Sequence, residues 1–133
     1  MVYESDLIRM ELHDDLVVAE YKPNVFIELE QAVNIVHERN KLAGDRPHFV
    51  LVKGGPITIA ANAKKYALSK ASAKNIIAWA VLDKQNMLKT TFIRILFFTQ
   101  GKGNCMRFFT DEQEAITWLN KKREKVPFTM RNN

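Results

Sequence analysis

The pattern of apolar and polar positions begins with two short apolar-rich runs, at residues 7–12 and 16–21. Between them lies the segment His13-Asp14-Asp15, whose residues favour a tight turn. Two such runs joined by a short polar turn predict a β-hairpin. Pro23 ends the second strand, because proline cannot donate a hydrogen bond to a neighbouring strand.

The period then changes to that of a helix over residues 28–42. The predicted buried face of this helix consists of Leu29, Ala32, Val33 and Val36. Gly44 and Pro47 follow the helix end, as is typical of helix termination. Residues 48–52 are nearly all apolar, which predicts a strand buried on both faces of a sheet.

A second helix and strand follow a glycine-rich turn. Thr58 is expected to cap a helix over residues 59–69. The stripe expected to lie close to the sheet consists of Ile59, Ala63, Tyr66 and Ala67. Residues 75–82 are again almost continuously apolar and predict a second buried strand.

The last part of the chain repeats this alternation. Residues 87–99 have helical spacing, although residues 92–98 would also suit a strand. Because the stretch contains no glycine or proline, we favour a helix there. Residues 105–109 predict a short strand, and Thr110 with Gln113 has the form of a capping box at the start of a helix. The order ββαβαβαβα predicts an α/β fold with a mixed, mostly parallel sheet.

The composition fits a globular protein, since 47% of the 133 residues are hydrophobic and 26% are charged. We expect a single domain over residues 1–125 and a flexible tail over residues 126–133. The amino terminus lacks the pattern of a secretory signal, and no apolar run approaches the ~20 residues of a membrane-spanning helix. Cys105 is the single cysteine, which excludes an intrachain disulfide. We therefore expect a cytoplasmic protein.

The net charge of +5 is unevenly distributed along the chain. Residues 1–45 carry ten acidic and four basic side chains, whereas residues 46–133 carry sixteen basic and five acidic ones. Either a basic face binds a polyanion, or acidic and basic faces attract each other within the fold or across a dimer. Aromatic residues do not alternate with the lysines as they do in platforms for nucleic acid, so we favour the second interpretation.

The turn after the first buried strand is a candidate anion or regulatory site, formed by Lys53, Gly54, Gly55 and Thr58. Glycines let backbone N–H groups approach a ligand, and the start of a following helix favours anions. The alternative is a tight turn in which Thr58 serves only as a helix cap. The full phosphate-binding loop motif is absent, and we expect no cofactor.

Patterns for metal binding and catalysis are missing from the sequence. His13, His37 and His48 fall on separate elements, and we expect them at the surface rather than around a metal. Cys105 lies in an apolar strand, where a buried, unreactive thiol is expected. No nucleophile or acid–base pair has the spacing that catalysis needs, so we do not expect an enzyme.

Aromatic residues supply a second candidate site. Phe92, Phe97 and Phe98 lie on the helix expected before the final strand, which carries apolar residues on more than one face. The extra face needs cover from a second subunit, another protein or an apolar ligand. Trp79 and Trp118 lie on apolar patterns and are expected in the core.

Three segments of the chain resemble the STAS-type, anti-sigma-factor-antagonist-like superfamily, in particular its small stand-alone bacterial members. They are the helix and strand within residues 31–52, the Pro56-Ile57-Thr58 turn, and residues 107–119. The last segment reads RFFTDEQEAITWL and is similar to the F-T-D-E-x-x-A-x-x-W-L ending of those proteins. The resemblance spans roughly residues 5–120.

The resemblance implies a mixed sheet backed by helices, used for regulation through protein contacts or for small-ligand binding rather than for catalysis. In antagonists of that superfamily, an Asp-Ser pair opens a helix and a partner kinase phosphorylates the serine. Residues 53–58 lack that pair and keep only Thr58 as a hydroxyl, which argues against a phospho-switch. We expect a non-catalytic regulatory or protein-interaction module, whose partner is a second copy or another protein. The alternative is a carrier of a small apolar or lipid-like ligand.

Overall fold

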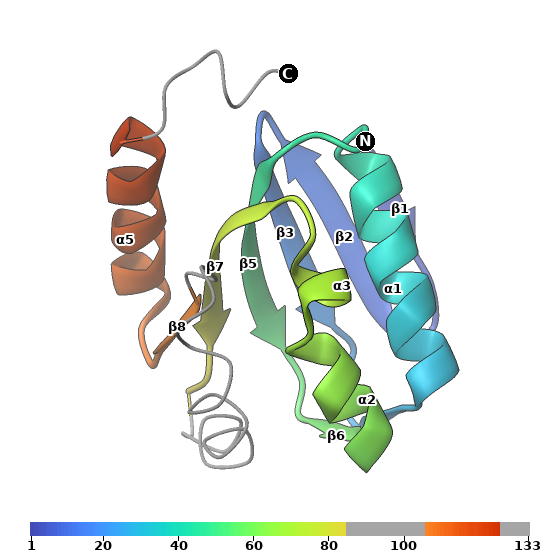
Figure 1. Ribbon diagram of the computed structural model, residues 1–133. Coiled ribbons are helices and arrows are strands. Elements are labelled where there is room, and N and C mark those ends of the chain that lie inside the picture. Colours follow the sequence, from blue (N-terminus) through green and yellow to red (C-terminus); the bar gives the residue numbers. More distant parts are fainter. Residues whose placement is uncertain (85–105, 126–133) are drawn as a thin grey trace.

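The structure is a computed structural model, and it describes residues 1–84 and 106–125 (Figure 1). Its strands are β1 (Val2–Glu4), β2 (Ile8–His13), β3 (Leu16–Tyr21), β4 (Val25–Ile27), β5 (His48–Gly54), β6 (Ile57–Ile59), β7 (Ile76–Leu82) and β8 (Met106–Phe109). Its helices are α1 (Leu29–Leu42), α2 (Ala61–Ala67), α3 (Lys70–Ala73) and α5 (Glu112–Lys125). The helix expected at residues 87–99 and the tail at 126–133 lie outside the described residues.

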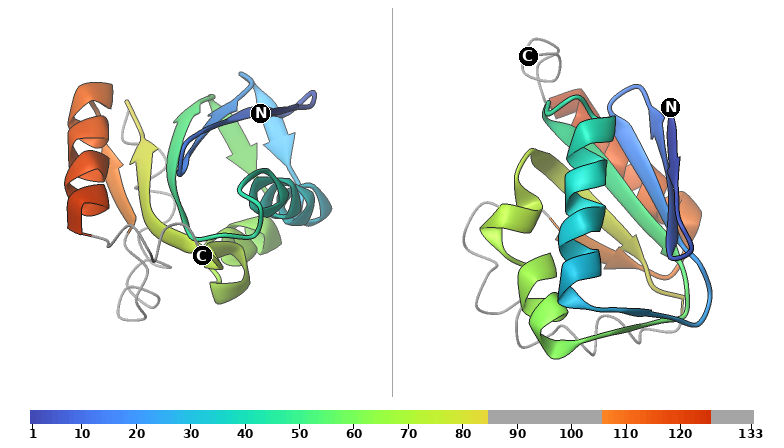
Figure 2. Two further views of the ribbon diagram at one scale, coloured as in Figure 1. Left: turned by 90° about the horizontal axis from the view of Figure 1, so that it is seen from above. Right: turned by 90° about the vertical axis from the view of Figure 1, so that its right-hand side faces the viewer.

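Six strands form one central sheet in the order β1-β2-β3-β5-β7-β8. Strands β1, β2 and β3 pair in antiparallel fashion, whereas β3, β5, β7 and β8 run parallel to one another. Helices α1, α2 and α3 cover one face of this sheet, and α5 covers the other (Figure 2). The predicted α/β class with a mixed, mostly parallel sheet is confirmed.

The predicted β-hairpin is formed by β2 and β3, in a register that places Leu12 opposite Val17. Asp14 turns the chain with a φ of 57°, a left-handed conformation that aspartate tolerates better than most residues. The strands predicted at residues 48–52, 75–82 and 105–109 correspond to β5, β7 and β8. The local sequence pattern was sufficient to predict these strands, because each is mostly apolar and is bounded by turn residues.

Strand β1 is an edge strand that the sequence pattern did not predict. It pairs with β2, so that Val2 lies opposite Glu11. On its solvent side Glu4 forms ion pairs with Arg9, at 2.9 Å, and with Lys22. Three residues are too few to show an alternating pattern, so the strand is recognisable only from its pairing.

Helix α1 has the predicted span, but Ala32 is the one residue of its predicted buried face that is buried. The buried residues are Ala32, Ile35, Arg39 and Leu42. Leu29 and Val33, which were expected in the core, are 37% and 43% exposed. The helix is rotated relative to the prediction because the arginine points inward, where carbonyl and imidazole groups accept its hydrogen bonds.

The helix predicted at residues 59–69 begins later than expected, and Thr58 is not its cap. Strand β6 occupies this position and pairs in parallel with β4, with Thr58 beside Phe26 in the register. The β-branched run Ile57-Thr58-Ile59 suits a strand once a partner is available. The helical segment then divides into α2 and α3, and Ser69 caps α3 by accepting a hydrogen bond from the N–H of Ser72 (3.2 Å).

Two hydrophobic clusters lie on the two faces of the sheet. The cluster under α1 and α2 includes Ile8, Met10, Val17, Ala19, Ile35 and Ala63. The cluster under α5 includes Phe49, Leu51, Ala78, Ala80, Ala115 and Leu119. Strand β5 is buried on both faces as predicted, since residues 48–51 are all buried.

Helix α5 begins one residue later than its predicted cap. Asp111, rather than Thr110, caps the helix, because its Oδ2 accepts a hydrogen bond from the N–H of Glu114 (3.2 Å). Trp118 packs against Phe109 with ring centroids 5.6 Å apart. It was expected in the core and is half-buried. Trp79, on β7, is likewise half-buried.

Candidate functional site

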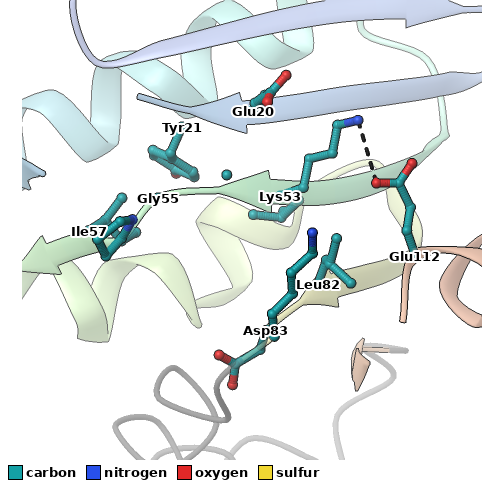
Figure 3. Close-up of a pocket in the computed structure, with 12 residues that line it drawn as sticks. Glu20, Tyr21, Lys53, Gly55, Ile57, Leu82, Asp83 and Glu112 are labelled. Carbon is teal, nitrogen blue, oxygen red and sulfur yellow. Dashed lines mark ion pairs between the residues drawn. The ribbon is translucent and has the colours of Figure 1, made fainter. Parts of the chain in front are cut away.

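A pocket of about 390 Å³ lies where β3, β5 and β7 end together (Figure 3). Parallel strands present their carboxyl ends at one edge of a sheet, which is where open α/β folds commonly bind ligands. The pocket is lined by Glu20, Tyr21, Val52, Lys53, Gly54, Gly55, Pro56, Ile57, Leu82, Asp83, Lys84 and Glu112. The lining therefore combines charged groups with an apolar wall.

The chain at the end of β5 requires a glycine. Gly54 has a φ of +93°, and a Cβ added there would lie 2.3 Å from the backbone oxygen of Tyr21. No L-residue with a side chain fits this contact between β5 and β3. Gly55 continues the turn with a φ of +90°, and its N–H donates a hydrogen bond to the same Tyr21 oxygen (3.1 Å).

An ion pair spans the pocket between β5 and the first turn of α5. Lys53 Nζ lies 3.7 Å from Glu112 Oε1, and Glu20 occupies the register position beside Lys53 on β3. Figure 3 shows Lys53 extending toward Glu112, whereas the carboxylate of Asp83 points away from this pair. A second ion pair holds the other end of α5, where Arg123 Nη2 lies 2.6 Å from Asp15 Oδ1.

The structure brings together three of the four residues predicted for the anion or regulatory site. Lys53, Gly54 and Gly55 line the pocket, whereas Thr58 is exposed on β6 and does not. The physical basis predicted for anion binding is wrong in two respects. The turn leads into a strand rather than into a helix start, and the Gly55 N–H is already bonded to Tyr21.

The formal charges of the pocket also do not favour an anion. Its lining contains three carboxylates, on Glu20, Asp83 and Glu112, and two amines, on Lys53 and Lys84. Sequence reasoning missed the carboxylates, although Asp83 directly follows a predicted buried strand and was recognisable by that rule. Glu112 carried no such signal, because only the packing of α5 brings it to the pocket.

The second predicted site, the aromatic face formed by Phe92, Phe97 and Phe98, lies outside the described residues. Cys105 does so too. Both predictions therefore stay predictions.

A buried polar cluster that the sequence did not reveal lies at the opposite end of the strands from the pocket, where β5 begins. Arg39 is 5% exposed; its Nη2 donates hydrogen bonds to the carbonyl oxygens of Ser72 (2.7 Å) and Lys74 (3.1 Å), and its Nε donates to His48 Nε2 (3.1 Å). His48 Nδ1–H in turn donates to the carbonyl oxygen of Arg46 (2.8 Å). These bonds join α1, the end of α3 and the start of β5.

Burial sets the protonation of this cluster. Loss of solvation, together with the nearby Arg39 cation, lowers the pKa of His48 to about 4, although the hydrogen bond to the Arg46 carbonyl opposes the shift. Burial also lowers the pKa of Arg39 to about 10, so the guanidinium stays charged at neutral pH. The surface position expected for His48 is wrong, since this side chain is 1% exposed. His13 and His37 are exposed as expected.

Residues 1–84 and 106–125 contain neither a cluster of metal ligands nor a membrane-spanning helix. No group of three or more His, Cys, Asp and Glu side chains in these ranges could hold a metal ion. No helix in the same ranges is long and apolar enough to cross a bilayer.

Comparison with solved structures assigns the fold. An uncharacterized protein from the DUF3478 family of Shewanella loihica PV-4, described as having a SpoIIAA-like fold, superposes with a TM-score of 0.56 at 16% identity. The match covers 88% of this chain and 98% of that one. The fold is thus of the SpoIIAA-like, STAS-type class that the three sequence segments indicated.

The family follows from a family model that matches residues 10–123 and is described as a domain of unknown function, DUF7793. The chain belongs to this family. A comparison with curated proteins gives no match.

Proposed function

We propose that this STAS-type domain is a non-catalytic regulatory module, and that a partner protein docks at the pocket formed by the ends of β3, β5 and β7. The observation that supports this proposal is the Lys53–Glu112 ion pair, which crosses the pocket beside the obligatory Gly54 turn. The likeness in fold supports a binding role rather than a particular partner.

The ion pair is suited to exchange with a partner's charge. The side chains of Lys53 and Glu112 are 26% and 44% exposed, and their charged atoms are 3.7 Å apart. A partly exposed pair of this kind contributes less than about 1 kcal/mol to stability. A basic side chain of a partner can therefore replace Lys53 beside Glu112 at little cost.

The chemistry of the expected partner follows from the charges around the pocket. Glu20 is exposed on β3 next to Lys53, and Glu112 lies opposite on α5. An arginine or lysine in an exposed segment of the partner would lie between these two carboxylates. Since Glu112 is in the first turn of α5, occupation of the pocket changes what holds that end of the helix to the sheet.

The test is capture of partners from cells that express the chain, with charge variants as bait. A partner held by the wild-type chain is expected to be lost by the Glu20→Lys/Glu112→Lys variant. It is expected to be retained by Lys121→Glu, an exposed charge reversal elsewhere on α5. Circular dichroism confirms that each bait is folded. Capture of identical proteins by wild type and the Glu20→Lys/Glu112→Lys variant, or of none by wild type, contradicts the proposal.

A second candidate function, binding of a small ligand, is favoured by the volume and apolar wall of the same pocket. A volume of about 390 Å³ is within the range of small-molecule sites, and Tyr21, Ile57 and Leu82 supply apolar surface. Native mass spectrometry of the chain purified without denaturant is the test. A bound mass that is lost in Ile57→Trp, which fills the pocket, supports the carrier function. The bare chain mass in the wild type excludes it.

A further inference from the structure

Helix α1 and the strand that leads into it, β4, present apolar side chains to solvent. Phe26 is 48% exposed, Leu29 is 37% exposed and Val33 is 43% exposed. Leu29 and Val33 are four residues apart and therefore lie on the same side of α1, whereas Phe26 belongs to β4, the strand that leads into that helix. Leu29 and Val33 form what we term the α1 apolar patch.

Opposite charges lie on two neighbouring parts of the layer formed by α1, α2 and α3. The start of α1 carries the exposed carboxylates Glu28 and Glu30. The residues between Arg46 and Leu82 include no aspartate or glutamate, and α2, α3 and the residue after α3 carry four lysines, Lys64, Lys65, Lys70 and Lys74. Among the described residues, none of these lysines takes part in an ion pair.

The acidic and basic parts are adjacent in space. Helices α1 and α2 pack against each other, with Ala32 and Ala63 in one buried cluster. The right-hand view of Figure 2 shows α1 beside α2 and α3 on the same side of the sheet. A surface that is acidic on one half and basic on the other is complementary to itself after a two-fold rotation about the boundary between the halves.

We propose that two copies of this chain associate through this layer about a two-fold axis between α1 and α2. The acidic start of α1 in each copy then faces the α2 lysines of the other, and the α1 apolar patch is covered between them. The contact occurs twice, so two weak charge attractions act together with burial of apolar surface at the centre. This inference concerns a surface separate from the pocket and does not rest on the proposed function.

A second copy fits this layer better than a nucleic acid or an anionic membrane does. Either of those partners would bring phosphate groups close to Glu28 and Glu30 as well as to the lysines. A second copy instead supplies carboxylates to the lysines and lysines to the carboxylates.

Sedimentation equilibrium of the wild-type chain over a range of concentrations is the first test. We expect a monomer–dimer equilibrium that shifts toward monomer as salt is added. Glu30→Lys and Lys65→Glu are each expected to raise the dimer dissociation constant by on the order of tenfold or more, since each change acts twice. A mixture of these two variants is expected to recover dimer, visible as a mixed species in native mass spectrometry, because opposite charges again face each other.

Two further variants make the result decisive. Leu29→Ser/Val33→Ser is expected to be monomeric, and Lys121→Glu, on the other side of the sheet, is expected to dimerise like wild type. A wild-type chain that is monomeric at every concentration overturns the inference. So does a dimer unaffected by Leu29→Ser/Val33→Ser. Binding of duplex DNA or anionic vesicles by a monomeric wild type, lost in Lys65→Glu, also overturns it and assigns the lysines to a polyanion.

Discussion

The Nε–H of Arg39 on α1 donates a hydrogen bond to Nε2 of His48 at the start of β5, over 3.1 Å, and both side chains are buried. This bond joins the inward face of α1 to the start of β5. It also fixes the histidine in its neutral form, with the proton on Nδ1 directed at the Arg46 carbonyl.

Replacement of Arg39 by methionine tests the structural role of this cluster. The variant leaves the carbonyl oxygens of Ser72 and Lys74 and the Nε2 atom of His48 without their donor. We expect a loss of about 2–4 kcal/mol in the free energy of unfolding, because buried acceptors are left unpaired. Urea unfolding followed by circular dichroism measures it. Lys41→Met, an exposed change on the same helix, is the control, and equal stabilities of the two variants would refute the role.

The dependence of stability on pH follows from His48. Its pKa is lowered to about 4 in the folded state, against about 6.5 when unfolded. Between these values the unfolded chain binds a proton that the folded chain does not. Stability therefore falls as the pH drops from about 6.5 to about 4, by roughly 3 kcal/mol from this group.

The measurement is the difference between wild type and His48→Gln in urea unfolding at a series of pH values. Other titrating groups contribute to both chains, so the difference isolates His48. We expect the wild type to lose its advantage over the variant progressively below pH 6.5. A difference that stays constant from neutral pH to about pH 4 contradicts the assigned protonation.

Gly54→Ala tests the turn beside the pocket. The added Cβ would meet the Tyr21 oxygen at 2.3 Å, so β3 and β5 must separate. Gly44→Ala is the matched control, because Gly44 also has a positive φ, of +66°, but its nearest contact is the flexible Arg46 side chain at 3.4 Å. We expect the control to cost about 1 kcal/mol, from the backbone conformation alone, and Gly54→Ala to cost clearly more. Thermal unfolding of both variants measures these losses of stability. Equal losses in Gly54→Ala and Gly44→Ala would contradict the close contact between Gly54 and the Tyr21 oxygen.

A double-mutant cycle on Lys53 and Glu112 tests whether their ion pair is weak enough to be replaced. The cycle compares Lys53→Ala, Glu112→Ala and the double variant with wild type. We expect a coupling of less than about 1 kcal/mol that decreases with added salt. A coupling well above that value, insensitive to salt, would mean that the pair is a fixed structural element rather than an exchangeable one.

Much of the fold could be predicted from the sequence, and the failures share a cause. The hairpin, β5, β7 and α5 were predicted because their apolar patterns are long enough to be read locally. Strands β4 and β6 have three residues each and exist only because they pair with each other. Their pairing depends on contacts between distant segments, which no local pattern contains.

The candidate site could likewise be predicted only in part from the sequence. Lys53, Gly54 and Gly55 form a contiguous turn after a buried strand, and the sequence pointed to them directly. Glu112 reaches the pocket only through the packing of α5. Arg39 is buried where it donates to the carbonyl oxygens of Ser72, in α3, and of Lys74, just after α3. Both are charged residues on helices, for which exposure is the ordinary expectation.

Hydrogen exchange of the chain with and without its captured partner shows whether the partner docks at the pocket formed by the ends of β3, β5 and β7. A partner bound there is expected to slow amide exchange in peptides covering residues 53–57 and 112–116, which flank the pocket. Protection confined to α2 and α3, with exchange at residues 53–57 and 112–116 unchanged, would contradict docking at this pocket.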